Sequence, residues 1–343
     1  MKVAVLAPVA WRTPPRHYGP WEQIASNIAE GLIKSGIEVT LFATGDSVTA
    51  GKLDAVCAIG YEEDRSQDAK ILECLHISNL MEKADQFDII HNNFDFLPLT
   101  YSGLIKTPMI TTIHGFSSPR IIPVYKKYND TGYYVSISNT DRSPELKYLA
   151  TVYNGLDTKD FEFYPNPEDY LLYFGRIHPD KGTAEAIQIA QKSKRRLLLA
   201  GIIQDENYYR EKVEPQLSAA IEYVGHAGPD KRKELLGNAY ALLHPISFNE
   251  PFGMSVAEAM LCGTPVIAFN KGSMPELIKH NQTGFLVDTV EEAVGAVSQL
   301  DQISRIDCFD WASSRFSCDK MVENYLELYK KILGKPVSGN ENI

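Results

Sequence analysis

The chain has 343 residues, of which 44% are hydrophobic and 23% charged, a length that favours two domains over one hydrophobic core. Its formal net charge of -10 argues against a nucleic-acid partner, because phosphate backbones need a basic face. No stretch approaches the roughly 18 apolar residues of a membrane helix, and the start is too short in apolar length for a signal peptide. The net charge offers no basic face that would indicate peripheral membrane contact.

Cysteine usage bears on the cellular compartment. The five cysteines are widely scattered and contain no C-x-x-C pair. This pattern predicts reduced thiols rather than a disulfide framework or a zinc site. We therefore expect a soluble, cytoplasmic protein, and Cys262 in particular is expected to lie in the core.

Strands and helices alternate along the first half of the chain. A buried strand is predicted at 2–10, an amphipathic helix at 21–36 and a second strand at 38–44. This β-loop-α-β unit indicates a parallel sheet with right-handed crossovers. Further strands are predicted at 87–91, 109–114, 133–138 and 151–153.

Two of these strands end in a histidine that is followed by a loop. His91 and His114 are predicted where doubly wound sheets bind their ligands, although a lone histidine is more often structural. His114 is the stronger candidate because Gly115 follows it. The first loop lacks G-x-G-x-x-G, so no NAD site is predicted.

The second half repeats the alternation after a turn at 153–157, near which we place the domain boundary. Strands are predicted at 170–174, 196–200, 221–225, 240–244, 265–269 and 285–287, and helices at 183–194, 291–300 and 310–331. The polar, Gly-containing tail at 334–343 is expected to be flexible.

A pair of cations follows the strand at 170–174. Arg176 and Lys181 lie five positions apart in a glycine-bounded loop before a helix. Such a pair can clamp a diphosphate, with Arg binding two oxygens and Lys acting as a compact charge. Taken alone, the arrangement is also common on protein surfaces.

A pair of carboxylates flanks the turn at 252–254, which leads into a helix. The helix N-terminus can hold a phosphate, and Glu250 and Glu258 can accept hydrogen bonds from sugar hydroxyls. The alternative is a capping box, in which Ser255 and Glu258 only satisfy backbone amides. Glu276, in another strand-to-helix turn, is either a site residue or a first-turn charge favoured by the helix dipole.

With these motifs in family order and spacing, the chain resembles the family 4 glycosyltransferases of the GT-B fold. The resemblance implies an α/β protein with two facing Rossmann-like domains, parallel sheets and a C-terminal helix that crosses back to the first domain. The implied divisions are an acceptor-side domain at 1–158, a nucleotide-sugar donor domain at 159–312, the crossing helix at 313–333 and the tail at 334–343.

The resemblance also implies roles for single residues. The catalytic set comprises Arg176 and Lys181 on the donor diphosphate, Glu250 on donor-sugar hydroxyls and His114 at the donor sugar. Donor binding is implied for Gly19, Phe252, Gly253, Met254, Glu258 on the ribose hydroxyls, and Glu276. Acceptor-side candidates are Tyr18, Asn93 and Asp95. Where the family often has Gly-Gly, this chain has Gly19-Pro20, and the proline removes one N–H donor.

Aromatic residues are frequent in the loops expected to select the acceptor. Rings in these loops can stack on a sugar, although buried packing explains them equally well. The residues concerned are Trp11, Tyr18, Phe94, Phe96 and Phe116.

The implied reaction is the retaining transfer of a hexose from a nucleotide-diphosphate sugar to an acceptor hydroxyl, with the leaving phosphate assisting deprotonation. The sequence has no Asp-x-Asp, in agreement with a metal-independent enzyme without a cofactor. UDP-glucose is the leading candidate donor and GDP-mannose the second. Glu250 is interpreted as a hydroxyl-binding residue rather than a covalent nucleophile. A GT-B nucleotide-sugar epimerase and a noncatalytic nucleotide-sugar binding subunit remain as alternatives.

Overall fold

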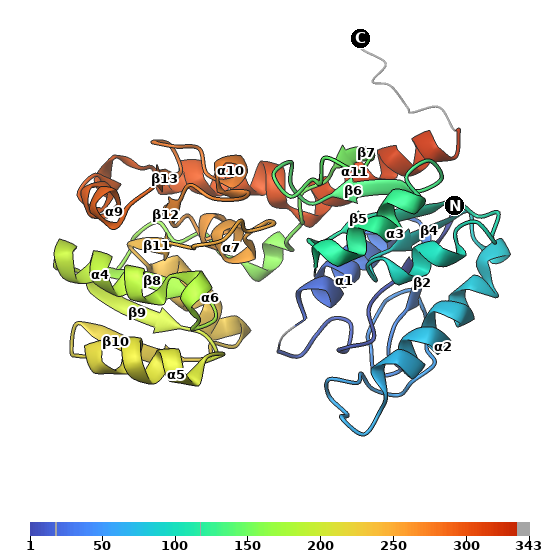
Figure 1. Cartoon of the computed structure of the whole chain (residues 1–343). Coiled ribbons are helices and arrows are strands. Elements are labelled where there is room, and N and C mark those ends of the chain that lie inside the picture. Colours follow the sequence, from blue (N-terminus) through green and yellow to red (C-terminus); the bar gives the residue numbers. More distant parts are fainter. Residues whose placement is uncertain (18, 117, 335–343) are drawn as a thin grey trace, which may run out of the picture. The chain divides into compact units, whose positions relative to one another are not determined.

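A computed structural model describes residues 1–17, 19–116 and 118–334, which divide into two units (Figure 1). The first unit contains Met1–Ile137, Arg142–Gly155 and the C-terminal segment from Cys318, and the second contains Ser138–Asp141 and Leu156–Ser317. After Gly334, the tail predicted at 334–343 lies outside the described residues.

The described part of the first unit contains a seven-stranded parallel sheet in the order β3-β2-β1-β4-β5-β6-β7. Its strands are β1 (Lys2–Leu6), β2 (Glu38–Phe42), β3 (Lys52–Asp54), β4 (Ile89–Asn92), β5 (Met109–Ile113), β6 (Tyr133–Ser136) and β7 (Tyr148–Thr151). Its helices are α1 (Pro20–Lys34), α2 (Ala69–Met81), α3 (Ile122–Lys127) and α11 (Cys318–Ile332). Strand order reverses between β1 and β4, the position at which such sheets bind ligands.

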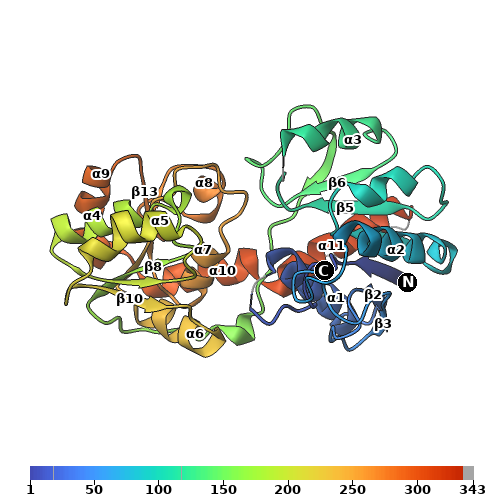
Figure 2. The same ribbon diagram turned by 60° about the horizontal axis from the view of Figure 1, so that its bottom comes forward.

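The described part of the second unit contains a six-stranded parallel sheet in the order β10-β9-β8-β11-β12-β13. Its strands are β8 (Tyr170–Phe174), β9 (Arg196–Ala200), β10 (Ile221–Gly225), β11 (Ala241–His244), β12 (Val266–Phe269) and β13 (Gly284–Val287). Its helices are α4 (Thr183–Ser193), α5 (Glu206–Tyr208), α6 (Pro229–Asn238), α7 (Met254–Leu261), α8 (Met274–Leu277), α9 (Val290–Val297) and α10 (Arg305–Phe316). Helices cover both faces, with α4 and α9 on one and α6 and α10 on the other (Figure 2). Here the order reverses between β8 and β11.

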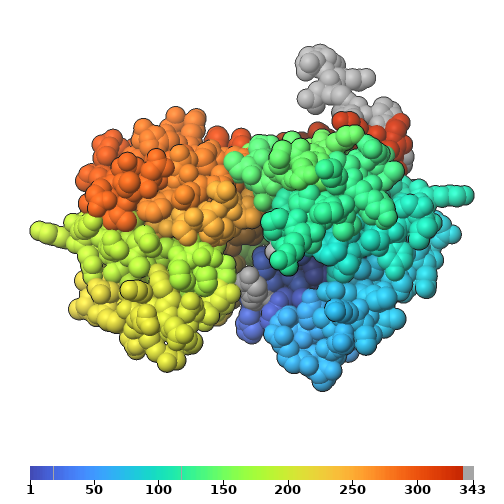
Figure 3. All heavy atoms as spheres, in the orientation of Figure 1, coloured from blue at the N-terminus to red at the C-terminus, as the bar shows by residue number. Residues whose placement is uncertain are grey.

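The predicted fold class, two Rossmann-like domains with parallel sheets, is confirmed. Strand β3 and helix α2 are among the elements that had no sequence prediction. Strand β3 is a three-residue edge strand, and α2 lies on the surface of the first unit, light blue in Figure 3, where it exposes Ile71 and Leu75. Helix α2 therefore lacks the single apolar face that identifies an amphipathic helix in a sequence.

The prediction of one continuous helix at 310–331 is wrong. Helix α10 ends at Phe316 and α11 begins at Cys318, because Ser317 between them has an extended backbone (φ -78°, ψ 151°). Apolar residues continue at helical spacing on both sides of Ser317, and for this reason periodicity alone did not reveal the break.

Helix α11 belongs to the first unit and packs against α1. His91 at the end of β4 forms hydrogen bonds with the Tyr329 hydroxyl of α11 (2.6 Å) and with Thr112 (2.8 Å). Burial lowers the pKa of His91 to about 3, so the ring is neutral at pH 7. These contacts make His91 a residue that holds α11, rather than a group that faces a ligand.

Arg305, at the first position of α10, connects three loops of the second unit. Its guanidinium donates to the carbonyl oxygens of Tyr164 (2.7 Å), Ala239 (3.0 Å) and Gly237 (2.6 Å), and to the Thr264 hydroxyl (2.8 Å). Hydrogen bonds from a charged donor are stronger than neutral ones, and carbonyl groups that lose their partner in a protein interior are costly.

Substitution of Arg305 with Met is therefore expected to lower the free energy of unfolding by about 3 kcal/mol or more. Urea denaturation followed by circular dichroism measures this loss. Arg210→Met is the matched control, because Arg210 is 66% exposed and forms only a long ion pair with Glu206; a change within about 0.5 kcal/mol is expected there. A loss below 1 kcal/mol for Arg305→Met would contradict this role.

Candidate active site

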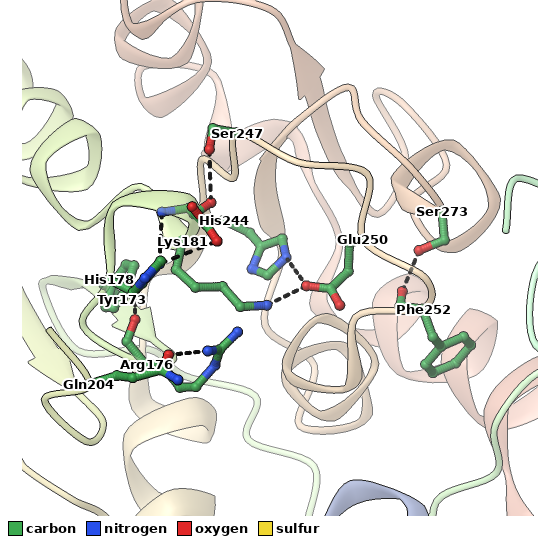
Figure 4. A network of polar contacts seen from close by, with 11 residues as sticks. Tyr173, Arg176, His178, Lys181, Gln204, His244, Ser247, Glu250, Phe252 and Ser273 are labelled. Carbon is green, nitrogen blue, oxygen red and sulfur yellow. Dashed lines mark hydrogen bonds and ion pairs between the residues drawn. The ribbon is translucent and has the colours of Figure 1, made fainter. Parts of the chain in front are cut away.

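The loops that follow β8 and β11 meet where the strand order of the second unit reverses. The Lys181 ammonium lies 2.5 Å from the Glu250 carboxylate, and the two side chains are only 16% and 14% exposed. Figure 4 shows Lys181 and His244 directed at the Glu250 carboxylate. The sequence prediction that these two loops share one edge of the sheet is confirmed by this contact.

His244, the last residue of β11, also lies beside Glu250. It was not identified as a candidate from the sequence. Its Nε2 lies 3.9 Å from Glu250 and forms no hydrogen bond within the described residues. Burial and the charge of Lys181 lower the pKa of His244 to about 3, so the ring is neutral at pH 7. The criterion that identified His91 and His114, a histidine at the carboxyl end of a strand, applied to His244 as well.

Arg176 extends from the same loop as Lys181, two residues after the end of β8. Its guanidinium donates to the side-chain oxygen of Gln204 in the loop after β9, and its carbonyl oxygen accepts from the Tyr173 hydroxyl at 2.6 Å. Arg176 is thus positioned by its backbone and by a neutral partner. A neutral amide that accepts a hydrogen bond from a guanidinium adds no negative charge, so the guanidinium can still attract an anionic ligand.

The turn before α7 is fixed by the backbone of Gly253 and by the packing of Phe252. Gly253 has φ 94° and caps the helix, and a Cβ at this position would lie 2.6 Å from Met274. The Phe252 side chain is 2% exposed and packs against Phe316, with ring centroids 5.7 Å apart. The Ser273 hydroxyl donates to the Phe252 carbonyl at 2.6 Å. Helix α7 therefore begins at Met254, and its positive end lies directly after Glu250 and Phe252 in the chain.

Glu258 lies in the second turn of α7 and is 5% exposed. The capping-box alternative is wrong, because the N-cap residue is Gly253 and no side chain caps the helix. Glu258 instead forms an ion pair with Arg232 of α6 at 3.2 Å. Burial raises the pKa of Glu258, and the Arg232 charge opposes this shift. No sequence signal distinguished Arg232 from the other charged residues of α6.

Glu276 holds a short segment through hydrogen bonds. Its two carboxylate oxygens accept from the backbone N–H and side chain of Asn139 and of Thr140, at 2.9 to 3.0 Å. Asp141 in the same segment has one buried oxygen that accepts no hydrogen bond from the described part of the chain. Burial, together with the charge of Glu250, raises the pKa of Asp141 to about 7. Sequence reasoning missed Asp141.

In the first unit, His114 and Asn93 come together at the ends of β5 and β4. The His114 Nε2 donates to the Asn93 side-chain oxygen at 3.0 Å, and its ring stacks on Trp21 at 5.8 Å. Burial lowers the pKa of His114 to about 3. The Asn93 amide nitrogen is buried and has no hydrogen bond to any residue that the structure describes. A neutral histidine with a fixed tautomer is suited to polar recognition rather than to charge stabilisation.

The remaining predicted residues of the first unit lie around α1 and β4. Gly19 is the N-cap of α1, with Pro20 at the first helical position, where a missing N–H removes no helical hydrogen bond. Asp95 has φ 85° and accepts a 2.5 Å hydrogen bond from Tyr125. Tyr18 lies outside the described residues.

Within 1–17, 19–116 and 118–334, no group of three or more His, Cys, Asp and Glu side chains could hold a metal ion. Among the helices of these residues, none has both the length and the hydropathy to cross a membrane. All five cysteines are free thiols, and Cys262 is buried as predicted.

Comparison with known proteins gives matches to the second unit and to the whole chain. A model of the family described as glycosyl transferases group 1 matches residues 157–305. An uncharacterized glycosyltransferase of Methanocaldococcus jannaschii is 25% identical over 344 residues, which cover 84% of this chain and 85% of that protein.

Two solved structures share the fold over nearly the whole chain. AviGT4, a glycosyltransferase involved in avilamycin A biosynthesis, has a TM-score of 0.72 at 23% identity. The match covers 98% of this chain and 99% of the AviGT4 chain. HepE of Anabaena in complex with UDP-glucose has a TM-score of 0.70 at 19% identity, with coverages of 96% and 100%. The family model and the relative identify the chain as a glycosyltransferase, a transferase enzyme, and the solved structures show that its fold is GT-B.

Proposed function

We propose that the chain is a retaining, metal-independent hexosyltransferase of family 4 that transfers a hexose from a nucleotide-diphosphate sugar to an acceptor hydroxyl. The contact that carries this proposal is the Lys181–Glu250 pair at the reversal point of the second sheet. A cation for a diphosphate and an anion for sugar hydroxyls lie side by side there, as a nucleotide sugar requires.

UDP-glucose is the proposed donor, and GDP-mannose is the second candidate. The support is the similarity in fold to HepE, whose structure contains UDP-glucose. In the proposed complex, Arg176 and Lys181 bind the diphosphate, and the N-terminus of α7 adds its partial positive charge. Glu258 accepts from the ribose hydroxyls, and the nearby Arg232 charge favours the ionised form of this buried carboxylate.

The proposed chemistry needs no metal. The bond between the anomeric carbon and the β-phosphate oxygen breaks as the acceptor oxygen bonds to the same face of that carbon. The acceptor proton moves to the departing phosphate oxygen, and the negative charge that develops on the diphosphate is stabilised by Arg176 and Lys181. Both cations are already in place before the reaction, so little reorganisation is needed.

Glu250 is proposed to hold hydroxyls of the donor sugar. One of its oxygens lies at 2.5 Å from Lys181, which lowers its nucleophilicity and leaves the other oxygen for the sugar. His244 and His114 are proposed as neutral polar partners of the donor sugar. We propose Glu276 as a positioning residue, because its hydrogen bonds hold the segment that carries Asp141 near Glu250.

Product analysis tests this function. The enzyme is incubated with UDP-glucose or GDP-mannose and a panel of sugar acceptors, with Mg²⁺ or with EDTA, and the product is analysed by proton NMR. We expect an α-linked glucoside from UDP-glucose at equal rates with and without EDTA. A β-linked product would contradict retention, an epimerised nucleotide sugar would indicate an epimerase, and no product from either donor would indicate a noncatalytic binding protein.

A further inference from the structure

A cavity of about 530 Å³ opens in the first unit, within the range of about 300–1,000 Å³ that is usual for small-molecule sites. It lies between the loop after β1, the loop after β4 and the start of α1, with Trp11, Phe96 and Gly19 among its lining residues. The first sheet reverses its strand order between β1 and β4. The cavity therefore occupies the position where doubly wound sheets bind ligands.

Aromatic rings form much of the cavity wall. Trp11, Trp21, Tyr61, Phe94 and Phe96 come from the two loops, from α1 and from the segment before α2. Except for Phe94, which is 6% exposed, these side chains are only partly buried. Partly exposed rings offer flat apolar surfaces to a ligand, and the C–H faces of a pyranose ring suit such surfaces.

The polar groups of the wall are acidic. Glu22 is 3% exposed, Glu73 accepts from the Tyr61 hydroxyl at 3.1 Å, and Asp95 is the third carboxylate of the wall. Among the described lining residues there is no Lys, Arg or His. Burial raises the pKa of Glu22 to about 7 and also raises that of Glu73, as expected for carboxylates without a cationic neighbour.

The nearest part of the first loop carries two arginines, and one of them, Arg16, is paired with acidic side chains. The Arg16 guanidinium forms ion pairs with Asp46 (2.9 Å) and Glu63 (2.7 Å). The Arg12 side chain donates to the Asp46 carbonyl at 2.9 Å. The described wall thus combines hydrogen-bond acceptors for hydroxyl groups with three acidic side chains and no cation, a composition that disfavours an anion.

We propose that this cavity is the acceptor subsite and that it selects a pyranose sugar without a phosphate, carboxylate or sulfate group. The assignment of the bound sugar as the acceptor rests on the proposed function. Aromatic faces hold the ring, and Glu22, Glu73 and Asp95 accept from its hydroxyls. A phosphorylated sugar of the same shape is excluded, because its dianion would lie beside acidic side chains with no cation among the described lining residues.

Matched pairs of ligands test the selection directly. Binding of D-glucose, D-mannose, D-galactose and D-glucosamine is compared with binding of their 6-phosphates by isothermal titration calorimetry, with and without saturating UDP. At least one sugar is expected to bind, and its 6-phosphate is expected to bind at least tenfold more weakly. Equal or tighter binding of the phosphates, or binding of no sugar in either state, would overturn the proposal.

Variants locate the binding in this cavity. Glu73→Gln and Trp11→Ala are each expected to weaken sugar binding about tenfold, while Glu73→Lys is expected to improve binding of the 6-phosphate. The control Glu82→Gln, which removes an exposed carboxylate at the end of α2, is expected to bind the sugar as the wild type does. Unchanged sugar binding in both Glu73→Gln and Trp11→Ala would overturn the assignment.

A further variant separates this proposal from the proposed function. Lys181→Met alters the second unit only, so sugar binding in the cavity is expected to persist in it. If the sugar binds with the expected dependence on Glu73 but UDP-glucose does not bind the wild type, the donor assignment fails and the sugar site stands. If UDP-glucose binds and no sugar does, the cavity proposal alone fails.

Discussion

Lys181→Met is expected to lower kcat for glycosyl transfer about 10²–10³-fold, the usual cost of removing one preorganised group that stabilises developing charge. The Lys181 ammonium is largely buried, lies 4.6 Å from the centre of the Phe248 ring and pairs with Glu250. Methionine fills a similar volume but carries no charge, so the leaving diphosphate loses a cation. Release of UDP at saturating donor concentration measures the effect.

A second lysine in the same part of the chain provides the control. Lys192 at the end of α4 is 47% exposed and pairs with Glu291 on the surface, so Lys192→Met is expected to leave kcat unchanged within about twofold. If Lys181→Met lowered kcat less than tenfold while folding normally, Lys181 would not be the diphosphate ligand.

Glu250→Gln is expected to lower kcat/KM roughly 10²-fold. The substitution removes a charged acceptor for the sugar hydroxyls, worth about 1.5–3 kcal/mol, and leaves the buried Lys181 ammonium without its counterion. Initial rates at low donor concentration measure kcat/KM. Glu222→Gln, on a surface pair with Arg196, serves as the matched control and is expected to keep wild-type activity.

A second substitution of Glu250 distinguishes hydroxyl binding from covalent catalysis. In Glu250→Ala, added azide is expected to restore no turnover. A residue that only binds hydroxyls makes no bond to the anomeric carbon, so azide has no missing nucleophile to replace. Restored donor consumption with formation of a glycosyl azide would instead identify Glu250 as the nucleophile that forms a glycosyl-enzyme intermediate.

The sequence predicted the parallel sheets and the two loops that meet at the site, because both follow from local patterns. Buried parallel strands are continuous apolar runs, and the carboxyl ends of such strands lie at one edge of the sheet. The loops that carry Lys181 and Glu250 both follow such runs. For this reason their contact could be predicted, although the two residues are 69 positions apart in the sequence.

The partners of the site residues were not predictable in this way. Arg232 pairs with Glu258 from another helix, and Glu276 holds Asn139 across 137 positions of sequence. Each of these contacts depends on side-chain directions that only tertiary packing sets. Ser317 is a similar case, because helical periodicity persists on both sides of an extended residue that belongs to neither helix.

Donor binding by the second unit is tested most directly by thermal unfolding of the wild type and of Arg176→Ala. The ligands are UDP, GDP, ADP and their hexose derivatives, each with Mg²⁺ or EDTA. We predict that UDP and UDP-glucose raise the Tm of the wild type equally in Mg²⁺ and EDTA, by an amount that corresponds to about 2.7 kcal/mol at a ligand concentration of 100 Kd, and that Arg176→Ala loses this shift. If no nucleotide raises the Tm of the wild type, the assignment of Arg176, Lys181 and Glu258 to a nucleotide-sugar site is contradicted.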